Sequence, residues 1–505
     1  MKKATMFKSI LSPFRKITTI RLWGSNINNT AVILTVSCLV TAVMLGVFTA
    51  YSGSLVFGFA LGVIGGLLLF LRPEILPVFL PLYIWLLQGR ADPGDILESV
   101  SLVRWITYIA IPIVLLRAIT DVVLRRRMYR TPIDIPLLAT IFIIGLAGII
   151  NHDYPQDIVF AIGVYLRYPL LFWALVNLNI NSDSYRHGLW VIIFASLLSI
   201  PESLIAWSVG RTSDSATWIF GPYGTAPLGF FIAVTQSVII SWGLLGRWRW
   251  YHTLLVTLLF IPAFIGTIRA LFILVPVIFI SVLFWIHTSG TKRRVLSYSI
   301  LLILVIGIVI LIAFPITKIF NSGVNAILTQ PWIILGVADN PGDNIYQYEA
   351  RLRAIQFVLG QMIQKGEILF GWGVRSFNPG SINVSSVGEG IQFLADAQGA
   401  QPGTEVVVGS QWVRSLGEIG LIGTLSYLLM LIPLFIMNRN MWQLTKDKHW
   451  RIILTSFFAI WLIYAVVAPW YNDVWRIDAI SAPFWLFAAA IFSHWRQNFR
   501  NETKS

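Results

Sequence analysis

The chain has 505 residues, of which 56% are hydrophobic and only 12% are charged, and its mean hydropathy is +0.75. Such a sequence has too little polar surface to cover soluble domains of ordinary size, so the composition excludes a soluble globular protein and indicates a membrane protein. The formal net charge of +14 could suggest a nucleic-acid partner, but the cations lie in short clusters between apolar runs, where positive-inside anchoring puts them. No nucleic acid is therefore expected as a partner.

The N-terminal residues 1–30 are basic and lack the short apolar stretch and small-residue cleavage site of a signal peptide, so we expect them to be retained. Apolar residues recur in this segment at helical spacing, with lysines and arginines between them. The pattern predicts a helix in the membrane interface on the cytoplasmic side, with its cations towards the lipid head groups. The apolar positions are Phe7, Ile10, Leu11, Phe14 and Ile17.

Apolar runs that are long enough, or nearly so, to cross about 30 Å of hydrocarbon follow along the rest of the chain. They begin near residues 31, 54, 75, 103, 134, 157, 188, 226, 252, 271, 297, 416, 452 and 477. We therefore expect an all-α polytopic membrane protein with about 14 (roughly 12–14) transmembrane helices. The runs near residues 75, 252 and 271 are short.

The distribution of positive charge predicts the topology. If the N-terminus is cytoplasmic, most lysines and arginines fall in segments on the cytoplasmic side, so both termini are expected there. One long segment then lies outside the membrane. The predicted parts are a basic segment 1–30, a transmembrane bundle 31–314, an extracytoplasmic loop 315–411, C-terminal transmembrane helices 412–495 and a cytoplasmic tail 496–505.

The long loop contains an amphipathic stretch, "YQYEARLRAIQFVLGQMIQ", in which Leu352, Ile355, Leu359 and Met362 repeat at helical spacing. This predicts a helix on the membrane surface, followed by an irregular loop in the glycine- and serine-rich "GWGVRSFNPGSINVSSVGEG". Because glycines such as Gly371 offer hinges, we expect the helix to act as a mobile lid. A helix packed permanently on the transmembrane helices is the alternative.

Arginines dominate the ionisable residues of the outward-facing side. Ionisable side chains in or near the hydrocarbon are costly, so they are candidates for function. A guanidinium group keeps its charge and donates paired hydrogen bonds to phosphoryl oxygens, which suits a diphosphate, and a lipid diphosphate is the obvious such ligand. The candidates are Arg211, Arg269, Arg351, Arg353, Arg375 and Arg414 on the outer side, with Arg167 and Glu202 within spans.

Several of these charges also have a purely structural explanation. Arg414 and Glu418 stand four residues apart on one predicted helix and could form only a local ion pair. Arg351 could be the solvated side of its helix. Glu202 could balance a neighbouring arginine such as Arg167 rather than act as a base.

Arg269 is harder to explain in this way, because it interrupts two apolar runs with almost no loop around it, and we expect it to be functional. The glycines Gly420 and Gly423 are expected to allow close packing of helices. The lone cysteine, Cys38, excludes an intrachain disulfide and a thiolate metal site, and the six histidines are scattered. The chain also lacks nucleotide-binding motifs, so we expect no metal and no cofactor, and an enzyme of this kind would need a donor that is already activated.

Three stretches in chain order resemble the O-antigen ligase and polymerase superfamily of bacterial membrane glycosyltransferases. "GTIRALFILV" is similar to the family's turn between two spans, with Ile268 where the family has serine. "RLRAIQFVLGQMIQKGEILFGWGVRSF" is similar to its arginine, helix and Gly-x-Gly, and the spacing from Gly371 and Gly373 picks out Arg353 as the matching arginine. "GSQWVRSLGEIGLIG" looks like its closing Glu-x-Gly-x-x-Gly pattern.

The resemblance implies transfer of a glycan from a polyprenyl diphosphate to an acceptor, on the outer face of a bacterial cytoplasmic membrane, without nucleotide or metal. Its partners would be the polyprenyl-diphosphate-linked oligosaccharide, membrane lipids and other polysaccharide assembly proteins. Arginines would stabilise the leaving diphosphate, and a base would deprotonate the acceptor. The resemblance and the charge pattern together give Arg269, Arg353 and Glu418 as catalytic candidates. The substrate-binding candidates are Arg211, Arg375, Arg414 and Arg167.

Other activities stay open at this point. Ligases of the family usually carry a histidine before the closing pattern, where this chain has Gly409 and Ser410, so a polymerase is favoured over an O-antigen ligase. A transporter, either a lipid-linked oligosaccharide flippase or a small-anion carrier, is the alternative from another class. The base is left open, with Glu349, Asp396, Glu405 and Glu418 as candidates.

Overall fold

The computed structural model describes ten stretches of the chain, which divides into two compact units, Met1–Gly65 and Gly66–Ser505. All but one of the described residues belong to the second unit, and the contacts below lie within it. The predicted interfacial helix in 1–30 and the apolar runs that begin near residues 31 and 297 lie outside the described residues. The described stretches are 65–86, 102–125, 128–209, 225–265, 271–287, 349–374, 376, 410–471, 474–475 and 478–499.

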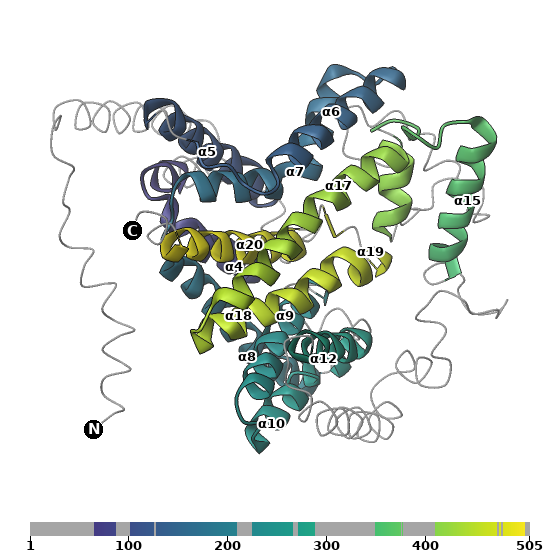
Figure 1. The fold of residues 1–505 in the computed structure, drawn as a ribbon. Coiled ribbons are helices and arrows are strands. Elements are labelled where there is room, and N and C mark those ends of the chain that lie inside the picture. The colour runs from purple at the N-terminus through teal and green to yellow at the C-terminus, as the bar shows by residue number, and fades with distance from the viewer. Residues whose placement is uncertain are drawn as a thin grey trace, which may run out of the picture. The chain divides into compact units, whose positions relative to one another are not determined.

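Every secondary-structure element within these stretches is helical, as the composition and the apolar runs predicted (Figure 1). The helices before the long loop are η1 (Pro73–Ile75), α4 (Leu76–Leu86), α5 (Leu102–Arg125), α6 (Asp134–Ile150), α7 (Pro155–Asn177), α8 (Ser182–Ser208), α9 (Thr225–Leu245), α10 (Trp250–Leu258), α11 (Ile261–Ile265) and α12 (Leu271–His287). The later ones are α15 (Glu349–Lys365), α17 (Gln411–Leu444), α18 (Lys448–Leu462), the π-helical turn η6 (Ile463–Val467), α19 (Ala468–Tyr471) and α20 (Asp478–Phe499).

Five helices in the described part are long and apolar enough to cross a membrane, which suggests a membrane protein. They are Pro155–Asn177, Ser182–Ser208, Leu228–Leu245, Gln411–Leu444 and Lys448–Trp470. A sixth is gained if Gly65–Leu71 and Pro73–Leu86, which meet at 105°, count as one span. The helices Trp250–Ile265 and Leu274–His287 are apolar but shorter, in line with the short runs predicted there. The predicted count of about 14 spans is not confirmed.

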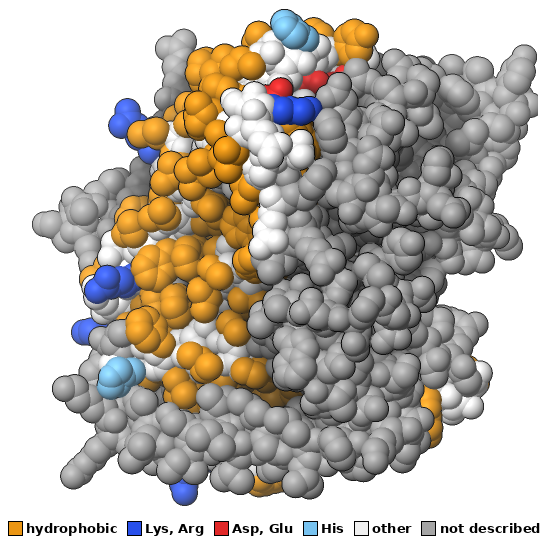
Figure 2. All heavy atoms as spheres, turned by 90° about the vertical axis from the view of Figure 1, so that its right-hand side faces the viewer, with side chains coloured by type: hydrophobic (Ala, Val, Ile, Leu, Met, Phe, Trp, Pro, Cys, Tyr) orange, Lys and Arg blue, Asp and Glu red, His pale blue; other side chains and the backbone are white. Residues whose placement is uncertain are grey.

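Helix α6 shows how these helices meet their surroundings. Ile135, Leu138, Phe142 and Ile149 recur at helical spacing on one face of α6, and all four are largely exposed. The other face, which includes Ile144, is buried in the bundle. A soluble protein rarely leaves such an apolar stripe in water, whereas lipid covers it without cost. Figure 2 shows a further face on which hydrophobic side chains cover most of the area that the described residues contribute.

Contacts at the helix ends join segments that the charge distribution assigns to the same side. Arg496, near the end of α20, donates a hydrogen bond of 2.7 Å to the carbonyl of Val176 at the end of α7. Both positions were predicted to lie at the cytoplasmic side. The backbone N–H of Val374 donates to Asp153 in the connection between α6 and α7 (2.8 Å), and both segments were predicted to face outwards. The two pairs are therefore consistent with the predicted order of helix directions.

Candidate functional site

Helix α17 is broken at Gly420, within the closing sequence pattern. Gly420 has φ 69° and ψ −173°, a conformation essentially limited to glycine, and residues on both sides are helical. A Cβ atom at this position would lie 2.3 Å from the carbonyl oxygen of Leu369. The sequence predicted that Gly420 allows close packing between helices. In the structure Gly420 also separates two helical segments of α17, one that ends before it and one that begins after it.

The segment after α15 supplies the hydrogen bonds that the break removes from α17. The N–H groups of Leu421 and Ile422 donate to the carbonyls of Ile368 (2.9 Å) and Leu369 (3.2 Å), and the carbonyl of Gly417 accepts from the N–H of Trp372 (2.6 Å). Buried backbone groups need such partners, since an unpaired one costs about as much as a lost hydrogen bond. The Gly-x-Gly segment and the Glu-x-Gly-x-x-Gly segment are therefore in contact, and each satisfies backbone groups of the other.

Gly371 lies at the centre of this contact. It has φ +73°, and a Cβ there would lie 2.5 Å from the carbonyl oxygen of Gly417. The close approach of the two backbones explains why a glycine stands here, and its role as a hinge stays a prediction. In this conformation the loop is hydrogen-bonded into α17.

Helix α15 corresponds to the predicted amphipathic helix and packs beside α17 (Figure 1). Val358 and Met362 of α15 are fully buried against Val413 and Leu416 of α17. The predicted stripe residues Ile355 and Leu359 are partly buried in the same cluster. Helix α15 therefore packs against the first half of α17, and the choice between a mobile lid and a permanently packed helix stays a prediction.

The connection between α6 and α7 holds the other glycine of the Gly-x-Gly pattern. Gly373 has φ +98°, and its Cβ would lie 2.6 Å from Oδ2 of Asp153. The same Oδ2 accepts the hydrogen bond from the N–H of Val374. A carboxylate thus fixes the chain just before Arg375, which itself lies outside the described residues.

Glu418 lies one turn after Arg414, in the turn of α17 that precedes the break, and only 1% of its surface is exposed. Its Oε2 accepts a hydrogen bond of 2.6 Å from the hydroxyl of Tyr165 on α7. Tyr165 is also 1% exposed. The sequence offered Arg414 as a local partner for Glu418, but it did not identify Tyr165. No local signal could have done so, because the two residues are 253 positions apart.

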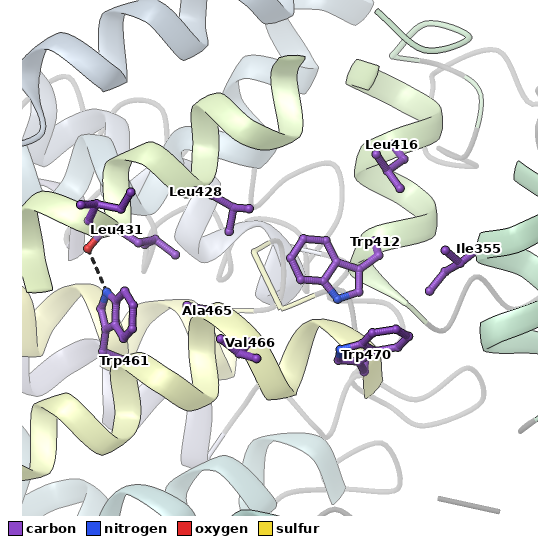
Figure 3. Close-up of a pocket in the computed structure, with 10 residues that line it drawn as sticks. Ile355, Trp412, Leu416, Leu428, Leu431, Trp461, Ala465, Val466 and Trp470 are labelled. Atoms are coloured by element: carbon purple, nitrogen blue, oxygen red, sulfur yellow. Dashed lines mark hydrogen bonds between the residues drawn. The ribbon is translucent and has the colours of Figure 1, made fainter. Parts of the chain in front are cut away.

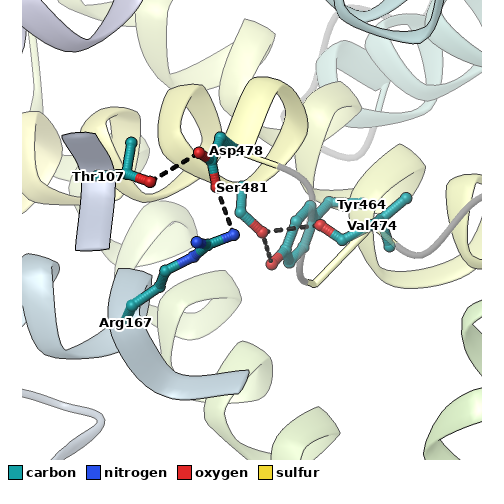
Figure 4. Close-up of polar contacts among 6 residues, drawn as sticks. All are labelled: Thr107, Arg167, Tyr464, Val474, Asp478 and Ser481. Carbon is teal, nitrogen blue, oxygen red and sulfur yellow. Dashed lines mark hydrogen bonds and ion pairs between the residues drawn. The ribbon is translucent and has the colours of Figure 1, made fainter. Parts of the chain in front are cut away.

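Arg167, two residues after Tyr165 on α7, forms a buried ion pair with Asp478 at the start of α20 (Figure 4). The side chains are only 7% and 6% exposed. The second carboxylate oxygen of Asp478 accepts from the hydroxyl of Thr107 on α5 (2.8 Å). The sequence predicted Arg167 as a substrate ligand, or as the partner of Glu202, and missed Asp478. An acidic residue at the start of an apolar run was the one available signal.

A second buried polar group lies beside this ion pair (Figure 4). The hydroxyl of Tyr464 is hydrogen-bonded to those of Ser481 (2.8 Å) and Tyr427 (2.9 Å), and Ser481 donates to the carbonyl of Val474 (2.8 Å). These bonds tie η6 and α17 to α20. Since each hydroxyl has a partner, the network specifies how the three helices pack.

An apolar groove of about 540 Å³ runs between α17 and the helix formed by α18, η6 and α19 (Figure 3). All its lining side chains are aliphatic or tryptophan. The indole N–H of Trp461 is satisfied by the carbonyl of Leu431 (2.9 Å). One end of the groove lies beside α15 and the Arg414 turn of α17. The lining residues are Ile355, Trp412, Leu416, Leu428, Leu431, Ile432, Trp461, Ala465, Val466 and Trp470.

The predicted site residues are therefore described to different extents. The side chains of Arg167, Arg414 and Glu418 are described, and Arg414 is half-buried. Arg353 and Glu349 are placed on α15 by their backbone, and nothing is described of their side chains. The remaining candidates, Arg211, Arg269, Arg375, Asp396 and Glu405, lie outside the described residues.

Comparison with protein-family models and with curated proteins finds no match to this chain.

Proposed function

We propose that the protein is a membrane glycosyltransferase that extends a glycan carried on a polyprenyl diphosphate. One observation carries the proposal. The Gly-x-Gly segment after α15 is hydrogen-bonded into the break at Gly420, so the helix that bears Arg353 stands against the helix that bears Arg414 and Glu418. A folded contact between these two patterns is what a shared site requires, and it supports a site in which the predicted arginines act together with a carboxylate.

In the proposed reaction the acceptor hydroxyl displaces the diphosphate from the anomeric carbon of the glycan. The bond between the anomeric carbon and the diphosphate oxygen breaks, and the diphosphate leaves with the electron pair. The acceptor hydroxyl oxygen forms the new bond to that carbon, and its proton passes to Glu418 as general base. Arg269 and Arg353 stabilise the charge that develops on the diphosphate, while Arg211, Arg375 and Arg414 hold it.

Arg167 takes a different part in this proposal from the one the sequence suggested. Because its guanidinium already faces Asp478 inside the bundle, it acts by fixing α7 against α20. The groove of Figure 3 suits the isoprenoid chain, since its wall is apolar and it begins beside α15 and Arg414. The isoprenoid chain of the donor would then bind in the groove, and its diphosphate would bind beside the end of the groove next to Arg414.

A transporter is the second candidate, and α17 itself favours it, because transporters bind substrates at discontinuous helices. In those proteins the free helix ends face the ligand. Here the N–H groups of Leu421 and Ile422 and the carbonyl of Gly417 bind the loop after α15. The backbone groups at the break are therefore already bonded to the protein and are not available to a transported ligand. This favours the enzyme over the transporter.

The proposal is tested by incubating the purified protein in detergent with a polyprenyl-diphosphate oligosaccharide and measuring the length of the products. Longer glycans are expected, with one polyprenyl diphosphate released for each transfer. Arg269→Lys is expected to lower the rate nearly as much as Arg269→Ala, by about 100-fold, because a point ammonium does not reproduce the guanidinium fork. Parental rates in both folded variants would remove Arg269 from the mechanism.

The transporter makes the opposite prediction for the same donor. If no product is lengthened, and if the protein in vesicles instead moves the lipid-linked oligosaccharide between leaflets, the glycosyltransferase proposal is wrong. The assay therefore separates the two candidates with one donor.

The proposed topology is tested by labelling. We expect the loop 315–411 to face outwards, so a Ser381→Cys variant in a Cys38→Ala background should react with a membrane-impermeant thiol reagent in intact cells. A cysteine at Ser505 should react only after permeabilisation. The reverse pattern would overturn the assigned orientation.

A further inference from the structure

We infer that Tyr165 is a positioning residue for the catalytic carboxylate of Glu418. The inference rests on the proposed function, because it assumes that Glu418 accepts the acceptor's proton. It adds a residue that the sequence analysis did not identify, two positions before Arg167 on α7.

The hydrogen bond joins two elements that are each held in place. On the α7 side, the ion pair between Arg167 and Asp478 fixes the helix two residues further on. On the α17 side, the turn that carries Glu418 is fixed by the bond from Trp372 to the carbonyl of Gly417. A distance of 2.6 Å between the oxygens of Tyr165 and Glu418 is therefore a property of the packed helices.

The chemistry of the bond determines what Tyr165 contributes. A hydroxyl that donates to a carboxylate forms a charge-assisted hydrogen bond, and it stabilises the ionised form that a base needs. It engages Oε2 and so restricts the rotation of the carboxylate. Because both side chains are almost fully buried, the bond selects one orientation of the carboxylate without competition from bulk water.

This role predicts an effect on turnover and not on donor binding. Tyr165→Phe should lower kcat by about tenfold and leave KM for the lipid-linked donor unchanged, since the donor does not touch the hydroxyl. In a Glu418→Gln background, the same Tyr165→Phe substitution should have no further effect on kcat, because the group through which it acts is already lost.

Tyr427 provides a matched control. It is a buried tyrosine on α17, and its hydroxyl is paired with that of Tyr464 rather than with Glu418. Tyr427→Phe should leave kcat unchanged in the wild-type background and in the Glu418→Gln background. Thermal unfolding of each variant shows whether it is folded at the assay temperature.

The experiment measures kcat and KM for the purified full chain and for the single and double variants, with a polyprenyl-diphosphate oligosaccharide as donor. A folded Tyr165→Phe with parental kcat, or one whose effect multiplies with that of Glu418→Gln, overturns the positioning role and leaves the proposed function standing. A wild-type protein that extends no glycan overturns the proposed function, and this inference with it.

Discussion

Replacing Asp478 with asparagine is expected to destabilise the folded protein by about 3–5 kcal/mol, because it leaves the charge of Arg167 buried without its counter-ion. The guanidinium lies in the bundle with 7% of its surface exposed, and the carboxylate also accepts from Thr107 on α5. One substitution therefore weakens the attachment of α20 to both α7 and α5. The measurement is the temperature at which half of the detergent-solubilised protein remains monodisperse after heating.

Two further variants separate the buried charge from other causes. Asp183→Asn removes an ion pair with Arg186 whose side chains are 60% and 61% exposed, and it should change this temperature little, because solvent screens such pairs. The double variant Arg167→Met with Asp478→Leu should recover most of the loss, since no charge is then left in the bundle.

The same set of variants decides the role of Arg167. If Asp478→Asn unfolds at the parental temperature while Arg167→Met loses donor binding, Arg167 is a substrate ligand, as the sequence suggested, and the ion pair does not fix α20. A loss of stability in both single variants, with recovery in the double variant, supports the structural role.

The second large effect is expected at Gly420. An alanine there would have to adopt a backbone conformation that only glycine occupies readily, at a cost of about 1–3 kcal/mol. Its Cβ would also meet the backbone of Leu369 at 2.3 Å, and overpacking of this kind adds about 1–3 kcal/mol. The substitution should therefore separate the loop after α15 from α17, lowering the unfolding temperature and exposing the amides of Trp372, Leu421 and Ile422 to hydrogen exchange.

Glycines elsewhere give the controls for this prediction. Apart from its chain neighbours and the backbone of its own helix, Gly163 on α7 has no atom within 4 Å of its Cβ position, so Gly163→Ala should be neutral or slightly stabilising. At Gly423 the Cβ would lie 2.7 Å from the Cβ of Ile419, so an alanine there also needs a local shift, but it needs no positive φ, and Gly423→Ala should therefore cost less than Gly420→Ala. Equal stability of Gly420→Ala and Gly163→Ala would show that the break is not needed for docking of α15.

Local sequence patterns determined much of this protein. Apolar runs predicted an all-helical chain with membrane-spanning helices, because a single helix must satisfy its own backbone in lipid. The stripe that includes Ile355, Leu359 and Met362 predicted α15, because residues three and four apart share one face of a helix. Membrane-spanning helices and the amphipathic stripe of α15 depend on residues within a few positions of one another, so they can be predicted from the sequence alone.

The tertiary structure alone decided which partner each polar group has. Glu418 had a candidate partner four residues away, yet it accepts from Tyr165 on another helix, and Arg167 pairs with Asp478 from the last helix. Gly420 could be recognised as a glycine that allows close approach, but the break in α17 exists because the loop after α15 replaces the lost hydrogen bonds. A buried charge or backbone group is stable only with a partner, and the partner is fixed by how distant helices pack, which no local spacing encodes.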